Sequence, residues 1–216
     1  MRNTTKASVI AVLAAVTCGA SLSAQTRHLE LQPDSKLWIE GTSTVHGWKC
    51  STSKINGLFD LGTKGNSVLD AGALTRVDVD VPVRSLDCGH GKMNRNMFDA
   101  LGADAYPSIK YSLIRYELVP GTATKDSATV RAIGSLQISG TTKEVTMDVR
   151  ARREGQIVRA EGKVALLMTD YGVKPPVVMA GLLKTGNQIT VNFDIRAALS
   201  PVVALAWDNA IPPVAR

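Results

Sequence analysis

The alternation of apolar and polar residues is the feature of this sequence that most constrains its fold. From Ile189 to Arg196, apolar side chains take the odd positions and polar side chains the even ones. Successive residues of a β-strand point to opposite faces, so this period of two predicts a strand with one buried face. The same period recurs over residues 76–81, 109–113 and 144–150. We therefore expect an all-β protein of half-buried antiparallel strands.

Short turns separate these stretches, which raises the question of how the sheet protects its edges. Pro120-Gly121, Ser139-Gly140 and Glu154-Gly155 are typical turn pairs. An open sheet of many strands exposes two edges, and closure into a barrel removes both. We predict an extended antiparallel β-barrel of about eight strands.

One segment departs from the period of two. Between residues 91 and 103, Met93, Met97 and Leu101 recur at helical spacing, and Gly102 is suited to end a helix. An isolated helix of this length is marginal in water, so its apolar stripe must pack on the barrel. We predict one short helix, inserted between two strands, that covers a barrel end with Met93 and Met97 as an adaptable lid.

The first 24 residues are typical of a secretory signal peptide. Arg2 and Lys6 precede an apolar run over residues 7–16, too short to span a bilayer, and small residues lead to a cleavage site near Ala24. We assign residues 1–24 to the signal peptide, 25–199 to the barrel domain and 200–216 to an extended apolar tail. The mature chain is expected in the periplasm or outside the cell, without a transmembrane segment.

The charge of the chain is modest. Its formal net charge is +6, and falls to +4 when the two basic residues of the signal peptide are removed. The remaining Lys and Arg residues are scattered, which does not favour a groove that follows a phosphate backbone. We expect no nucleic-acid partner.

Two segments hold the most reactive side chains. His46, Trp48 and Cys50 alternate, so they point to one face of a strand, and Cys88 stands two residues before His90. In an oxidising compartment, the two cysteines left after signal cleavage are expected to form a Cys50–Cys88 disulfide. Alternatively, the two cysteines and two histidines supply the ligand set of a tetrahedral zinc site, although their spacing matches no known zinc module.

The sequence carries no catalytic signature. A cysteine nucleophile needs a base within hydrogen-bond reach, and His46 lies two pleats from Cys50 on a regular strand. No nucleophile elbow, His-Glu-x-x-His motif or Gly-rich phosphate loop occurs. We predict no enzyme activity, no catalytic residue, no metal and no cofactor, and we interpret His46 as a hydrogen-bonded structural residue near a barrel end.

The interior of such a barrel is either filled by side chains or left open for one small ligand, and periodicity does not separate the two. Aromatic residues make up only 5% of the chain, whereas Val, Leu, Ile and Met are abundant. This composition favours a long aliphatic cavity.

Residues 42–48, Thr-Ser-Thr-Val-His-Gly-Trp, and residues 85–87, Ser-Leu-Asp, are the first of several short motifs that resemble those of a known family. They are similar to the S-T-x-H-G-[FW] segment and the S-L-D-T-G stretch of the YceI-like family of exported bacterial proteins. The other similar segments are residues 96–107 for its helix ending in F-D-A…Y-P, 134–143 for its G-x-L-T-I-x-G-x-T-K signature and 170–173 for its D-[FWY]-G-[VI] segment. The resemblance runs from residue 37 to residue 196 in the family's order.

This resemblance implies a lipocalin-like barrel whose elongated apolar cavity holds a polyisoprenoid or a similar lipid. We predict a non-catalytic carrier, monomeric or weakly dimeric, for a long-chain isoprenoid lipid or the tail of an isoprenoid quinone. A structural or partner-binding barrel with a filled core is the alternative. The residues predicted to point inward and bind the ligand are Trp38, Trp48, Val79, Val81, Met93, Met97, Leu113, Leu136, Met147, Leu166, Met168, Val191 and Phe193.

Two features depart from the family pattern. Cys50 and Cys88 stand where Gly and Thr are more common, which suggests that this branch ties the His46 strand to the segment before the helix. Residues 167–169, Leu-Met-Thr, precede Asp170 where many relatives carry a basic residue. A head-group preference is therefore not carried over from the family.

Overall fold

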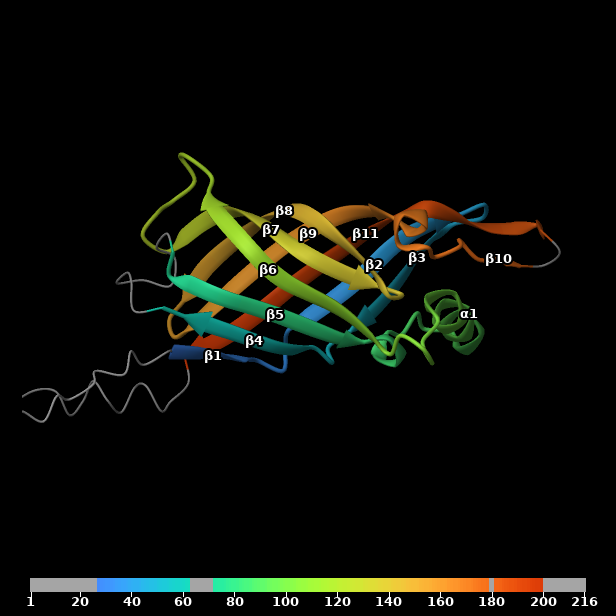
Figure 1. The fold of residues 1–216 in the computed structure, drawn as a ribbon, viewed down its shortest axis with the longest axis horizontal. Coiled ribbons are helices and arrows are strands. Elements are labelled where there is room, and N and C mark those ends of the chain that lie inside the picture. The colour runs from blue at the N-terminus through green and yellow to red at the C-terminus, as the bar shows by residue number, and fades with distance from the viewer. Residues whose placement is uncertain (1–26, 63–71, 179–180, 200–216) are drawn as a thin grey trace, which may run out of the picture.

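Eight antiparallel strands close into a barrel in the computed structural model, which describes residues 27–62, 72–178 and 181–199 (Figure 1). The ring contains, in spatial order, β1 (Arg27–Leu31), β4 (Asn56–Leu61), β5 (Leu74–Pro82), β6 (Ser108–Leu118), β7 (Ser127–Ile138), β8 (Thr141–Glu154), β9 (Ile157–Leu167) and β11 (Leu183–Leu199). Pairing of β1 with β11 closes it. The predicted all-β barrel is confirmed, whereas the predicted signal peptide and tail lie outside the described residues.

The longest strand, β11, pairs with other strands along both of its edges. One edge of β11 pairs with β9 from Gln188 to Ala198. The other edge pairs first with β2 (Lys36–Ser43) and then with β1, so two successive strands share one edge. At the break between them, the buried Ser35 hydroxyl donates to the Arg196 carbonyl oxygen at 3.1 Å and accepts from the Arg196 N–H at 2.9 Å. Ser35 thereby supplies the acceptor for the Arg196 N–H, while the Arg196 carbonyl oxygen also accepts the Gln32 N–H at 2.7 Å.

The remaining elements gather at one end of the barrel (Figure 1). Strand β3 (Gly47–Thr52) pairs with β2, and the short β10 (Val177–Val178) pairs with β11. Helix α1 (Gly91–Leu101) lies between β5 and β6, after the 3-10 turn η1 (Val83–Ser85); a second 3-10 turn, η2 (Met168–Tyr171), follows β9. Gly102 ends α1 in the left-handed conformation, with φ of 62°. The predicted helix and its terminating glycine are confirmed.

A compact apolar cluster lies beside α1. Its buried members come from β7, β8, β9, η2 and the segment just after η2, and Ala100 and Leu101 of the helix pack against them. The Ser139 hydroxyl donates to the Leu101 carbonyl oxygen at 2.9 Å and fixes the end of the helix to the β7–β8 turn. The buried residues of this cluster are Leu136, Ile138, Val145, Leu166, Met168, Tyr171 and Val173.

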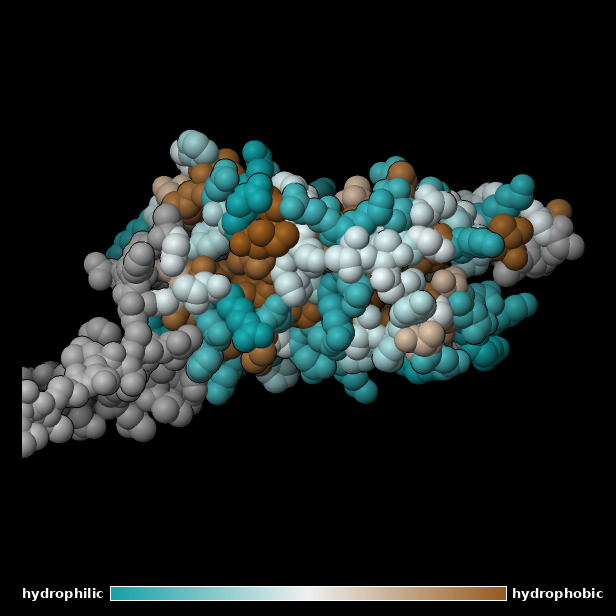
Figure 2. Space-filling view, in the orientation of Figure 1, coloured by the Kyte–Doolittle hydropathy of each residue, from teal (hydrophilic) through white to brown (hydrophobic). Residues whose placement is uncertain are grey.

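The wall is discontinuous along part of the boundary between β5 and β6. Among the described residues, their pairing covers only residues 78–82 and 108–112, and beyond it the two strands diverge (Figure 1). The Leu74 N–H donates to the Tyr116 hydroxyl at 3.1 Å and bridges the gap there. Apolar side chains are visible in this region of the surface in Figure 2.

Candidate functional site

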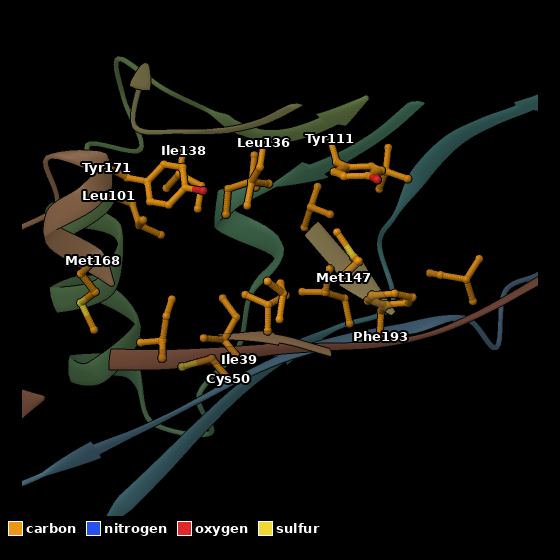
Figure 3. Close-up of a pocket in the computed structure, with 18 of the residues that line it drawn as sticks. Ile39, Cys50, Leu101, Tyr111, Leu136, Ile138, Met147, Met168, Tyr171 and Phe193 are labelled. Carbon is orange, nitrogen blue, oxygen red and sulfur yellow. The ribbon is translucent and has the colours of Figure 1, made fainter. Parts of the chain in front are cut away.

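The barrel encloses a cavity of about 730 Å³ with an almost entirely apolar lining. Along β11, Ile189, Val191, Phe193 and Ile195 line the cavity, whereas the intervening polar residues do not. The period of two in the sequence therefore produces this wall directly. Figure 3 shows side chains such as Leu136, Met147 and Phe193 pointing into the same space.

The cavity is long as well as apolar. On β11 its lining extends from Leu183 to Ala197. At a rise of about 3.3 Å per residue and a strand tilt of about 40°, these fourteen steps correspond to roughly 35 Å along the barrel axis. The shape suits an extended chain better than a compact molecule.

Eleven of the thirteen residues predicted to bind the ligand line the cavity; whether they contact a ligand remains a prediction. They come from β3, β5, β6, β7, β8, β11, α1 and η2, which the sequence does not place next to one another. The eleven are Trp48, Val79, Val81, Met93, Met97, Leu113, Leu136, Met147, Met168, Val191 and Phe193.

The other two residues lie elsewhere. Trp38 is on the outer face of β2, where its indole N–H donates to Glu40 Oε1 at 3.1 Å and Lys49 Nζ lies 4.8 Å from the ring centre. Its predicted inward direction is wrong, because Leu37 and Ile39 on either side take the cavity positions. Leu166 is buried in the cluster beside α1 and is not part of the cavity lining.

Two glycines in the wall leave room for aromatic rings to lie flat against it. A Cβ atom on Gly162 would stand 2.5 Å from Cζ of Phe193, its cross-strand partner. A Cβ atom on Gly134 would overlap the Tyr111 ring and hydroxyl. Both rings therefore occupy space that a side chain would fill. Sequence reasoning missed this arrangement, although a glycine inside a strand often marks such a close approach.

Tyr111 carries the one buried hydroxyl of the described lining that has no hydrogen-bond partner. Burial raises the pKa of this phenol to about 12, since the charged form would lose its hydration. The group is therefore neutral at physiological pH and keeps an unused donor at the cavity wall.

Polar lining residues other than tyrosines gather at the α1 end. Ser43 ends β2 and His46 lies in the β2–β3 turn. His90 caps α1, Lys92 and Asn96 lie on it, and Thr185 is on β11. His46, His90 and Lys92 are exposed, so the cavity reaches the surface here. Sequence reasoning identified His46 and His90 as notable residues but missed the polar group as a whole.

The segment that contains His46 is held by local contacts. His46 Nδ1 lies 2.9 Å from the Gly47 carbonyl oxygen, which fits the interpretation of a hydrogen-bonded residue near a barrel end. Trp48 and Cys50 line the cavity with it, as the alternation predicts. The Trp48 ring crosses Gly41, its cross-strand partner, and its indole N–H donates to the Thr42 carbonyl oxygen at 3.0 Å.

The two cysteines form the predicted disulfide, with their Cα atoms 3.9 Å apart. Next to it, Ser51 and Asp87 exchange two backbone hydrogen bonds of 2.8 and 2.9 Å. The crosslink thereby ties β3 to the segment that enters α1. Because both sulfur atoms are used, the four-ligand zinc arrangement is not formed, and the described residues contain no other cluster of three potential metal ligands.

Comparison with known proteins now identifies the domain. The family model of the YceI-like domain matches residues 34–197. The chain belongs to the YceI-like family. The match spans the strands from β2 to β11 and the helix between β5 and β6, so it includes every residue of the cavity lining except Leu29 of β1. No curated protein matches the chain. None of the described helices is long and apolar enough to cross a membrane.

Solved structures share the fold of this YceI-like domain. BcnA of Burkholderia cenocepacia superposes with a TM-score of 0.60 at 15% identity, over 76% of this chain and 96% of BcnA. A polyisoprenoid binding domain from Saccharophagus degradans, implicated in plant cell wall breakdown, gives 0.59 at 13%, over 81% and 98%. The YceI protein of Campylobacter jejuni gives 0.54 at 13%, over 70% and 84%. At these identities the likeness concerns the fold.

Proposed function

We propose that this protein is a non-catalytic binding protein that holds one long apolar chain inside its barrel, most simply that of a polyisoprenoid. The observation that carries the proposal is the elongated apolar cavity of about 730 Å³. A barrel with a filled core, the alternative function, does not fit a cavity of this size. The structural similarity to a polyisoprenoid binding domain supports the choice of chain.

The energetics of such binding require no charged partner in the cavity. Burial of each methylene group contributes about 0.8 kcal/mol, so an extended chain is held by many small contributions. The lining is largely pre-formed, because the aromatic rings over Gly134 and Gly162 already lie against the wall. A chain that enters therefore displaces few side chains, which lowers the cost of binding.

The distribution of polar groups supports one orientation of the ligand. His46, His90, Lys92 and Asn96 line only the α1 end. A polar head group left deep in the apolar part of the barrel would lose its hydration without compensation. We therefore place the head group at the α1 end and the tail toward β1. The predicted export to the periplasm or beyond fits a carrier of this kind and remains a proposal.

Native mass spectrometry of protein purified from an exporting host tests the proposal, followed by solvent extraction of whatever is released. A stoichiometric long-chain isoprenoid supports the carrier function and names its ligand. An apo mass that stays unchanged after incubation with polyprenols and quinones contradicts it.

A further inference from the structure

The three most exposed large apolar side chains among the described residues lie at the same end of the molecule as the polar cavity mouth. They are Leu182, Val45 and Val177, with 77%, 69% and 57% of their surface exposed. Burial is the usual state of such side chains, so a group of them at one place indicates a contact surface.

Hydrogen bonds hold these residues in one unit. The β2–β3 turn carries Val45, and its Thr44 N–H donates to the Lys184 carbonyl oxygen at 3.0 Å. The Thr44 hydroxyl donates to the Leu182 carbonyl oxygen at 3.2 Å. Val177 of β10 pairs with Lys184 of β11. We call this unit, formed by Val45, Val177 and Leu182 on two joined hairpin tips, the apolar rim; it extends beyond the barrel in Figure 1 and carries apolar surface in Figure 2.

The apolar rim borders the opening of the cavity. His46, Pro176 and Leu183, each adjacent in sequence to a rim residue, belong to the cavity lining. A molecule that touches the apolar rim therefore also faces the opening through which a ligand leaves or enters.

The charge around the opening is positive. The segments 41–49, 88–97, 171–178 and 181–187, which supply the rim and the polar mouth, contain no acidic residue. They contain five basic residues, Lys49, Lys92, Arg95, Lys174 and Lys184. Of the flanking acids, Glu40 pairs with Lys49, its Oε1 3.8 Å from Nζ, and Asp87 accepts hydrogen bonds from the Asn94 amide and the Gly89 N–H. Asp99 and Asp170 lie on α1 and η2, so the four other basic residues leave the opening with a net positive charge.

We propose that the apolar rim docks on a membrane surface that contains anionic lipids, so that the cavity opens onto the lipid phase; this inference rests on the proposed function. Exposed apolar side chains beside basic ones are the combination that binds the interface of an anionic bilayer. A long apolar chain is poorly soluble in water, and docking of the mouth lets it pass between bilayer and barrel without crossing the solvent. The basic segments favour this partner over a neutral surface.

Flotation of the purified exported protein with lipid vesicles tests the docking. Vesicles of phosphatidylglycerol and phosphatidylcholine should bind the protein, and each lysine of the rim region should contribute about fivefold to the affinity. Replacing Lys174 or Lys184 by Gln should therefore weaken binding by about fivefold, and phosphatidylcholine alone should bind weakly. The double variant Val45→Ser, Leu182→Ser should weaken binding by about tenfold.

A matched control variant distinguishes the rim from general surface hydrophobicity. Leu58 on β4 and Ile114 on β6 are 54% and 55% exposed on the barrel wall. The double variant Leu58→Ser, Ile114→Ser should leave vesicle binding unchanged. Equal binding by the rim and control variants overturns the proposal, as does a wild-type protein that fails to bind the anionic vesicles at low salt. Self-association that depends on Val45 and Leu182, without vesicle binding, also overturns it by pointing to a second copy.

Extraction of the same samples separates the two proposals. Rim variants that retain their bound chain but lose vesicle binding support docking and carriage together. Protein that binds vesicles through the rim but never holds a chain contradicts the proposed function and leaves docking standing. Protein that holds a chain, but whose vesicle binding does not depend on the apolar rim, supports the proposed function and contradicts docking.

Discussion

Replacing Val191 by Arg tests the cavity most directly. Val191 lies near the middle of the lining on β11, which extends from Leu183 to Ala197, and its partners Ile39 and Val164 on the flanking strands also line the cavity. An arginine there divides the apolar space and places an unpaired charge in it. If it displaces only four methylene groups of a bound chain, it removes about 3 kcal/mol, or about 200-fold in Kd.

The neighbouring position supplies the control. Thr190 does not line the cavity, and its cross-strand partner is Glu40, which is able to accept a new guanidinium on the outer face. Thr190→Arg should therefore bind a long-chain polyprenol as the wild type does, whereas Val191→Arg should lose it. Native mass spectrometry titration measures both, and circular dichroism checks that both fold. Equal affinity of the two folded variants refutes the assignment of this face of β11 to the cavity.

Three other predictions concern the stability of the barrel. Replacing Cys50 and Cys88 by Ala removes a crosslink between residues 38 positions apart and should lower the free energy of unfolding by about 4 kcal/mol, measured by urea denaturation; a loss below about 1 kcal/mol contradicts it. Gly162→Ala should cost about 1–3 kcal/mol in the same assay and reduce polyprenol capacity, because its Cβ pushes the facing aromatic ring inward; unchanged capacity contradicts this. Arg159 donates two hydrogen bonds to Asp194 and lowers the pKa of that carboxyl. The contribution of this ion pair to the free energy of unfolding is therefore complete above the unfolded pKa of about 3.9 and is lost as pH falls through the lower folded pKa. Asp194→Asn should flatten the pH dependence of the free energy of unfolding in that range.

In strand β11 the sequence alone was sufficient to predict which face is buried. Apolar and polar residues alternate strictly from residue 189 to 196, so only the face that carries Val191 and Phe193 is able to be the buried one. The helix was equally predictable, since Met93 and Met97 recur at helical spacing and Gly102 follows. In both cases the pattern is local, and no partner strand is needed to interpret it.

Trp38 shows where local pattern is insufficient. Leu37, Trp38 and Ile39 are three consecutive apolar residues, so alternation does not show which of them point inward. Strand pairing determines their direction, because Leu37 lies opposite Phe193 and Ile39 lies opposite Val191. The phase of β2 is thus set by a strand about 150 residues later in the chain.

Alternation alone did not predict the cavity, for a related reason; only the composition and the family resemblance favoured it. Whether a barrel is filled depends on how large side chains on one strand meet small ones on the next. Gly162 becomes informative only when Phe193 is known to lie opposite it. The basic mouth is likewise assembled from four segments that are separate in sequence and meet only at the α1 end.

Because β1 and β2 share one edge of β11, the width and the length of the barrel are determined by different features. The number of strands in the ring sets the width of the barrel. The length of the barrel depends instead on β11, a 17-residue strand along which β2 and β1 pair one after the other, with Ser35 at the junction between them. Insertions or deletions in the hairpins beyond this junction would lengthen or shorten the barrel while its diameter stays constant. If the proposed function holds, homologous domains of this design are thus able to diverge in the length of the chain they bind without changing topology.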